Sequence, residues 1–134
     1  MQRSNPKYIG PGYWASWHIK TLLTDNKEKK SEVARMISID IENFPCLECK
    51  NHAIEYVKNH SLKPSVEDPD PHSLFKWTVN FHNEVNMRLG YPMIDWSQAK
   101  KMWSKESFCL EDCGENQVVE SEVEKEVDMI LRSF

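Results

Sequence analysis

The sequence lacks any long apolar run. No stretch approaches the roughly 20 apolar residues that a membrane-spanning helix needs, and the first residues contain no apolar segment of signal-peptide length. We therefore expect a soluble protein that is not exported by the general route. The sequence also lacks a basic stripe, and its formal net charge of -4, with acidic residues concentrated after residue 110, argues against nucleic acid as the main partner.

Convincing strand alternation is absent as well. Apolar residues instead recur at three- and four-residue intervals, which is typical of helices. The 134 residues suggest one domain, long enough to bury a core without disulfide bonds to hold it. We predict an all-α protein, a small four-helix bundle plus a short fifth helix.

The expected helices are separated by clear turn signals. Residues 1–10 are polar and punctuated by proline and glycine, so we expect a mobile lead-in there, and the three prolines of residues 64–71 predict a loop. Either Ser97 or Asp95 could cap the last helix. The helices are expected from Gly12, over about 33–44, from about Pro45 to 59, over about 71–89 and over about 94–103.

Two of the four cysteines, Cys46 and Cys49, stand three positions apart. This spacing places both sulfurs on one face of a helix, and Pro45 suits a first turn because the amide hydrogen that it lacks has no partner there. The unpaired amides at that helix end would stabilise a thiolate at Cys46, so the pair could perform thiol–disulfide exchange. The same spacing allows three other interpretations: half of a zinc site, a thioredoxin-like motif, or two buried small residues that happen to be cysteines.

Polar residues interrupt two apolar helix faces. Trp14 and His18 lie one turn apart on the first expected helix, which fits either a packed core or a flat aromatic ligand. On the fourth, His82, Asn83 and Asn86 break an apolar stripe, and each would cost about 1 to 3 kcal/mol if buried without a partner. Three such residues close together indicate a polar ligand lying against this helix.

A second sulfur pair lies in the acidic C-terminal segment. Cys109 and Cys113 are close enough in sequence to form a reversible disulfide, and the alternative is two incidental surface cysteines. Beyond them, apolar residues keep helical spacing up to Phe134. That stretch could dock on the bundle, meet a second subunit or fray.

These motifs together resemble a known family. Trp14-x-x-x-His18, Cys46-x-x-Cys49 and His82-Asn83-x-Val85-Asn86-x-x-Leu89, in this order on successive expected helices, resemble the FAD-dependent sulfhydryl oxidases of the Erv and augmenter-of-liver-regeneration type. The similarity runs from about Gly10 to Trp103. It is greatest to the compact enzymes of large DNA viruses, which make disulfides in virion proteins within the host cytoplasm.

The resemblance implies an oxidase domain over residues 11–104, usually a homodimer, followed by a tail over 105–134. It implies a Cys46–Cys49 disulfide beside the flavin, a shuttle disulfide between Cys109 and Cys113, protein thiols as substrates and oxygen as the electron acceptor, reduced to hydrogen peroxide. It implies no metal. The residues expected at FAD are Gly10, Trp14, His18, His82, Asn83, Val85, Asn86, Leu89 and Trp103.

Two other classes of protein remain open from the residues alone. A zinc-binding module could use Cys46, Cys49 and His52, with His60, Cys109 or Cys113 completing the site. A structural helical protein would fit the amphipathic pattern but leaves the polar residues of the fourth helix unexplained. A thioredoxin-like protein needs a sheet, and the pattern predicts none.

Overall fold

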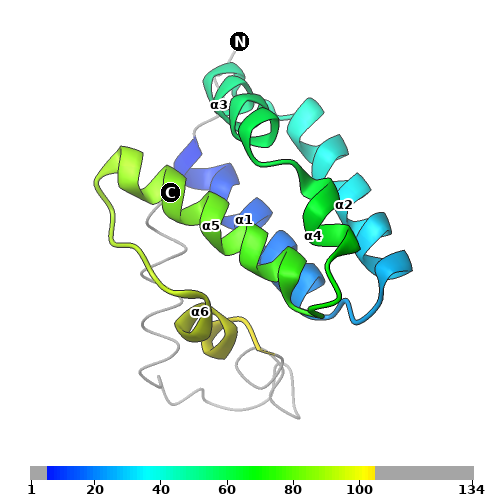
Figure 1. Cartoon of the computed structure of the whole chain (residues 1–134). Coiled ribbons are helices and arrows are strands. Elements are labelled where there is room, and N and C mark those ends of the chain that lie inside the picture. Colours follow the sequence, from blue (N-terminus) through cyan, green and yellow to red (C-terminus); the bar gives the residue numbers. More distant parts are fainter. Residues whose placement is uncertain (1–5, 105–134) are drawn as a thin grey trace, which may run out of the picture.

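The computed structural model describes residues 6–104, with side chains from Gly10 onward, and this part of the chain contains six helices and no strand. The predicted all-α fold is thereby confirmed, and Figure 1 shows the arrangement. The expectations about residues 105–134, including Cys109 and Cys113, lie outside the described residues. The helices are α1 (Pro6–Leu22), α2 (Lys27–Glu42), α3 (Leu47–Asn59), α4 (Leu62–Glu67), α5 (Ser73–Leu89) and α6 (Trp96–Met102).

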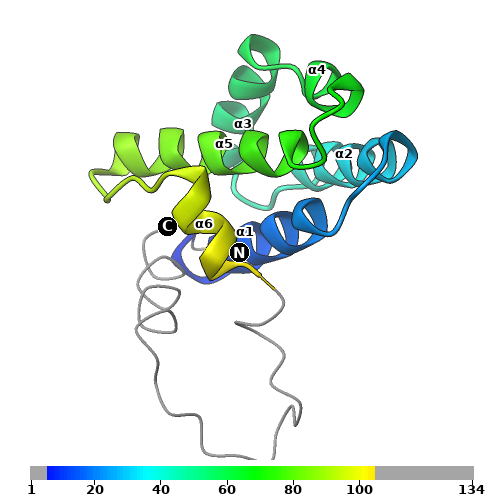
Figure 2. The ribbon, with the colours of Figure 1, turned by 60° about the horizontal axis from the view of Figure 1, so that its bottom comes forward.

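Helices α1 and α5 form the centre of the molecule. The remaining helices lie on two sides of this pair, with α3 and α4 on one side and α6 on the other (Figure 2). None of the helices in the described part is both long and apolar enough to cross a membrane.

The apolar side chains bury themselves in two clusters. The larger joins α1, α2, α3 and α5 through residues such as Trp17, Ile37, Tyr56 and Phe81, all of which are nearly inaccessible to water. The smaller lies where α6 meets α1 and α5, and contains Phe75, Val79, Ala99, Met102 and Trp103. Because α6 has only seven residues, this second cluster is what holds it against the bundle.

The starts of α1 and α3 differ from the sequence prediction, whereas the N-cap of α6 agrees with one of its two predicted alternatives. Helix α1 begins at Pro6 and not at Gly12, since a proline is tolerated at the first position of a helix. Helix α3 begins at Leu47, because Cys46 has an extended backbone and acts as the N-cap, so Pro45 precedes the helix. Helix α6 has Asp95 as its N-cap in a capping box with Gln98, as one of the two predicted alternatives.

The predicted loop over residues 64–71 is wrong for its first half. Residues up to Glu67 belong to α4, which Ser61 caps. Pro64 is the third residue of this helix, and the amide that it lacks is among the four at a helix N-terminus that have no partner within the helix. A proline in the first turn therefore did not break the helix.

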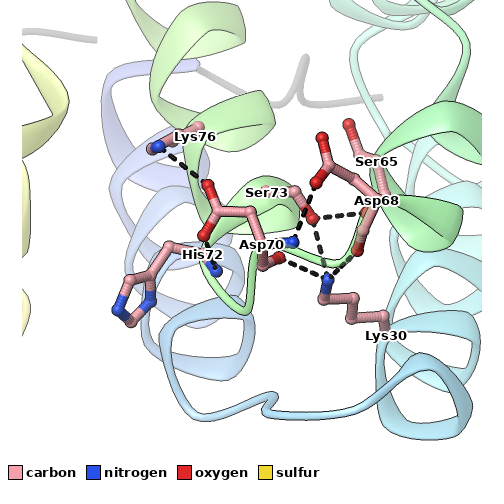
Figure 3. Close-up of polar contacts among 7 residues, drawn as sticks. All are labelled: Lys30, Ser65, Asp68, Asp70, His72, Ser73 and Lys76. Atoms are coloured by element: carbon pink, nitrogen blue, oxygen red, sulfur yellow. Dashed lines mark hydrogen bonds and ion pairs between the residues drawn. The ribbon is translucent and has the colours of Figure 1, made fainter.

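Lys30 has a buried ammonium group that joins α2 to the segment between α4 and α5 (Figure 3). Its Nζ donates to the backbone oxygens of Asp68 and Asp70 at 2.8 and 2.5 Å and to Ser73 Oγ at 2.9 Å. All three of its donors thus have an acceptor, which is what makes burial of this charge tolerable. The charged sequence of residues 25–30 predicts a turn, but α2 begins at Lys27 and Lys30 is buried.

Replacement of Lys30 by methionine should lower the free energy of unfolding by about 2 to 4 kcal/mol. The substitution keeps the apolar stem but leaves two backbone oxygens and a hydroxyl without their donor. Urea unfolding followed by circular dichroism measures the loss. The matched control is Lys29→Met, because Lys29 is exposed and pairs only with exposed Asp25, and equal stability of the two variants would contradict the assignment.

Candidate functional site: a dithiol beside two neighbouring pockets

The Cys46–Cys49 pair lies at the start of α3. The backbone N–H of Cys49 donates to Cys46 Sγ at 3.3 Å, and the Cys49 thiol donates to the same sulfur at 2.6 Å. Cys46 Sγ thus accepts two hydrogen bonds at the N-terminus of a helix. The prediction that Cys46 lies at this end of a helix is confirmed, while its part in catalysis stays a prediction.

Cys49 differs from Cys46 in its surroundings. Burial, followed by the hydrogen bond to Cys46, raises the pKa of the Cys49 thiol to about 12, and the positive charge of Arg88 opposes this rise. At neutral pH Cys49 therefore keeps its proton in the dithiol form. Because both cysteines are only partly buried, another thiol can approach the pair.

Cys49 lines a largely apolar pocket, which we call the thiol pocket. Its empty space, counted out to the solvent, is about 440 Å³. Aromatic rings and aliphatic side chains from α1, α3 and α5 form most of its wall, a lining that suits a flat apolar ring. Its residues are Gly10, Tyr13, Trp14, Trp17, Phe44, Cys49, His52, Ala53, Phe81, Val85 and Arg88.

A second pocket is more polar, and we call it the histidine pocket. It lies between α1, α5 and α6, and its empty space, counted out to the solvent, is about 280 Å³. Five of the nine side chains expected at FAD line it, namely His18, His82, Asn83, Asn86 and Trp103. The complete lining also includes Val79, Pro92, Ile94 and Ala99.

The two pockets are neighbours. Trp14, in the wall of the thiol pocket, stacks on His82 of the histidine pocket with ring centroids 4.2 Å apart and planes 5° from parallel. Eight of the nine predicted residues thus gather around this stacked pair. The exception is Leu89, which lines neither pocket and is 46% exposed.

Two buried polar atoms of the histidine pocket have no partner within the described residues. These are His82 Nε2 and Asn86 Oδ1, one turn apart on α5. An unsatisfied buried polar group costs about 1 to 3 kcal/mol, so donors on a bound ligand would remove a penalty that the protein alone carries. These two atoms therefore suit hydrogen bonds to the polar groups of a cofactor such as FAD.

Asn83 has a different role from Asn86. Its Nδ2 donates to Ile94 O at 2.6 Å, and its Oδ1 accepts from Ile94 N at 2.9 Å. This pair of bonds fastens the chain after α5 to the helix and shapes the wall of the pocket. The polar character of Asn83, which suggested a ligand in the sequence, is met by the protein backbone.

The two histidines of the pocket are neutral. Burial lowers the pKa of His82 to about 3. Burial, and secondarily the charge of His82, lowers the pKa of His18 well below its usual value. Because desolvation disfavours the imidazolium ion, both rings keep one lone pair that can accept a hydrogen bond.

Several residues of the site were not expected from the sequence. Tyr13, Phe44 and Arg88 line the thiol pocket, although only their place beside predicted positions could have indicated it. His52, considered above as a metal ligand, lines the same pocket and has Nε2 3.8 Å from Glu48 Oε1. Between residues 6 and 104, no three His, Cys, Asp or Glu side chains are grouped as a metal site would need.

Comparison with known proteins identifies the family. The model of the Erv1 / Alr family matches residues 11–104. The FAD-linked sulfhydryl oxidase of African swine fever virus is 30% identical over 99 residues, covering 72% of this chain and 80% of the viral one. The putative FAD-linked sulfhydryl oxidase 347L of Invertebrate iridescent virus 6 is 31% identical over 113 residues, covering 77% of this chain and 98% of its own.

A more distant relative is the FAD-linked sulfhydryl oxidase ERV1 of Arabidopsis thaliana, 24% identical over 102 residues, which cover 72% of this chain and 50% of the plant protein. The fold and the site define an all-helical protein with a dithiol at the edge of an aromatic pocket. This chain belongs to the Erv1 / Alr family.

Proposed function

We propose that this protein is an FAD-dependent sulfhydryl oxidase that forms disulfide bonds in protein thiols. The observation that carries the proposal is the Cys46–Cys49 pair, whose inner sulfur lines an aromatic pocket next to buried acceptors that need a ligand. Family membership and the printed names of the relatives support the same activity. The site residues, which follow from resemblance and geometry, are part of this proposal.

The two pockets divide the proposed cofactor contacts. The flat ring system suits the thiol pocket with Gly10, Trp14 and Val85, and the polar groups of the dinucleotide suit the histidine pocket. There the proposed contacts are His18, His82, Asn83, Asn86 and Trp103. Leu89 stays a prediction for which the pocket geometry gives no support.

The chemistry of the chain is thiol–disulfide exchange. A substrate thiolate attacks Cys46 Sγ of the oxidised pair, the S–S bond breaks, and Cys49 leaves with the electron pair and takes up a proton. A second substrate thiol then attacks the mixed disulfide, which releases an oxidised substrate and leaves two electrons on the dithiol. Bound FAD would supply the acceptor for this electron pair and its route to oxygen, with hydrogen peroxide as the product.

Arg88 favours the return of Cys49 to a reactive form. Its positive charge is the one effect near this thiol, apart from a backbone hydrogen bond, that lowers its pKa. Oxidation of the dithiol requires loss of the Cys49 proton, so the guanidinium at the wall of the thiol pocket aids that step.

The proposal extends to parts of the protein beyond the described residues. The oxidase domain is taken as residues 11–104, and the Cys109–Cys113 pair of the tail as a shuttle that accepts electrons from substrate and passes them to Cys46. A homodimer is proposed from family resemblance. The viral sources of two relatives suggest a viral protein. Action in the host cytoplasm, and in virions, is proposed from the family resemblance alone.

The visible spectrum of the purified full-length protein tests the function. Protein from a flavin-replete host should be yellow, carry about one FAD per chain and consume oxygen with a dithiol. Trp14→Phe should reduce the FAD content, whereas Trp96→Phe, outside both pockets, should not. A colourless protein that contains zinc would support the metal-binding alternative, and a colourless protein without metal would support a structural role.

A further inference from the structure

A chain of hydrogen bonds runs from α5 to α1 and back to α5. It starts at Thr78, passes through His18 and ends at His82, and all three side chains are buried. Thr78 Oγ1 lies 2.9 Å from His18 Nδ1, and His18 Nε2 lies 2.9 Å from His82 Nδ1. Thr78 lines neither pocket, so any effect on a ligand is transmitted through the two histidines.

The direction of the first bond is set by the hydroxyl of Thr78. Its Oγ1 lies 2.7 Å from the backbone oxygen of Phe75, and two oxygens at this distance need a proton between them. A carbonyl oxygen has none to give, so the threonine donates its only proton there. Toward His18 the hydroxyl can therefore only accept, and His18 must carry its proton on Nδ1.

The remaining protons follow in order. A neutral His18 with its proton on Nδ1 has a lone pair on Nε2, so His82 must donate from Nδ1. A neutral His82 then has a lone pair on Nε2, the atom that has no partner in the described structure. Burial lowers the pKa of both rings, which keeps each of them at a single proton.

We propose that Thr78 is a positioning residue that fixes the tautomers of His18 and His82, so that His82 Nε2 presents a hydrogen-bond acceptor to the bound dinucleotide. The inference rests on the proposed function for the identity of the ligand. Asn86 adds a second acceptor one turn along α5. Its Nδ2 donates to Pro92 O, and its Oδ1 has no partner among residues 6–104.

The two acceptors define the chemistry that this part of the histidine pocket accepts. A ligand group facing them must carry hydrogen-bond donors, such as an amino group or hydroxyls. Phosphate oxygens are disfavoured at this position, because they would place a hydrogen-bond acceptor against another acceptor. The two acceptors thus favour the orientation of the dinucleotide in which its donor groups, and not its phosphates, face His82 and Asn86.

Nitrogen-15 NMR of histidine in the full-length holoprotein tests the proposal. In the wild type, His18 and His82 should both show a protonated Nδ1 and an unprotonated Nε2. Thr78→Val removes the acceptor at nearly constant volume, so the protons can shift to the Nε2 atoms and both rings should lose the pure Nδ1–H signature. FAD should then bind about tenfold more weakly, which corresponds to about 1.4 kcal/mol.

Two further variants separate tautomer control from packing. Thr78→Ser keeps the hydroxyl and should restore both the wild-type signals and the affinity for FAD. Thr24→Val removes another buried threonine hydroxyl bonded to a carbonyl three residues earlier, at 2.7 Å, but has no histidine partner and should leave the signals unchanged.

The proposal is overturned if wild-type His82 carries its proton on Nε2, or if Thr78→Val keeps the wild-type tautomers. The same holds if Thr78→Val and Thr24→Val weaken FAD binding equally. A wild-type protein that binds no FAD would contradict the proposed function instead, and the nitrogen signals of the ligand-free chain would still report whether Thr78 fixes the tautomers.

Discussion

Replacing either Cys46 or Cys49 by serine is expected to reduce dithiol oxidation by at least about a thousandfold while FAD stays bound. Serine keeps the size of the side chain but cannot form a disulfide. The variant therefore cannot cycle between the dithiol and the disulfide, and it cannot take two electrons from a substrate. FAD should stay bound because the sulfurs contribute little to the pockets: Cys49 is one of eleven residues that line the thiol pocket, and Cys46 lines neither pocket. Oxygen consumption with dithiothreitol, together with the flavin absorption of each variant, measures both parts.

The two serine variants should differ in what they accumulate. In Cys49→Ser the sulfur of Cys46 remains at the helix N-terminus, so incubation with a small disulfide should trap a mixed disulfide on it, with one thiol of the reagent released. In Cys46→Ser, burial still raises the pKa of the remaining Cys49 thiol, which should therefore form less adduct at neutral pH. Mass spectrometry of the intact protein measures the amount of adduct on each variant.

Variants of the tail cysteines are compared with the Cys46 and Cys49 variants in the same oxidation assay. The double variant Cys109→Ser, Cys113→Ser should oxidise dithiothreitol nearly as well as wild type but a reduced protein more slowly. Turnover by Cys46→Ser or Cys49→Ser within tenfold of wild type would contradict the mechanism. Equal turnover of a reduced protein by the double variant would remove the tail from it.

The second large effect is a loss of stability in mild acid. Because burial lowers the pKa values of His18 and His82, the unfolded chain binds protons that the folded protein does not as pH falls below about 6.5. The free energy of unfolding should then decrease toward low pH by up to about 1.4 kcal/mol per pH unit for each histidine. For His82 this continues down to its folded pKa of about 3.

Urea unfolding between pH 7.5 and 5, at a fixed excess of FAD, measures the effect above the range in which most carboxyl groups titrate. His82→Gln should remove about half of the pH dependence. His52→Gln is the control, because that imidazole is 39% exposed and lies outside the buried histidine pair. An unchanged slope in His82→Gln would show that this ring is not held neutral by the fold.

Local sequence signals identified most of the helices and the two helix faces that carry the site. A helix face is made of residues three and four apart, so the stripe of α5 and the dithiol of α3 could be recognised without knowing what packs against them. The same reasoning missed α4, because the three prolines hid the fact that a proline is harmless in the first turn.

Burial was harder to predict than helix formation. Lys30 was assigned to a charged turn because its three acceptors come from residues 38 to 43 positions later, and no periodicity reports them. Leu89 has the spacing of the α5 stripe, yet it is the last residue of the helix and is 46% exposed. Helical spacing predicts a common face but not what covers it.

The sequence by itself determined the helical class, the position of two thiols at the start of a helix and the family whose motifs they complete, since these depend on residues close together in the chain. Only the tertiary structure decided that His18 meets His82, that Asn83 serves the backbone while Asn86 keeps a free acceptor, and that the dithiol opens on an aromatic pocket. The physical reason is that hydrogen-bond partners and desolvation are set by side chains brought together from distant segments, whereas helix formation is set largely by neighbours.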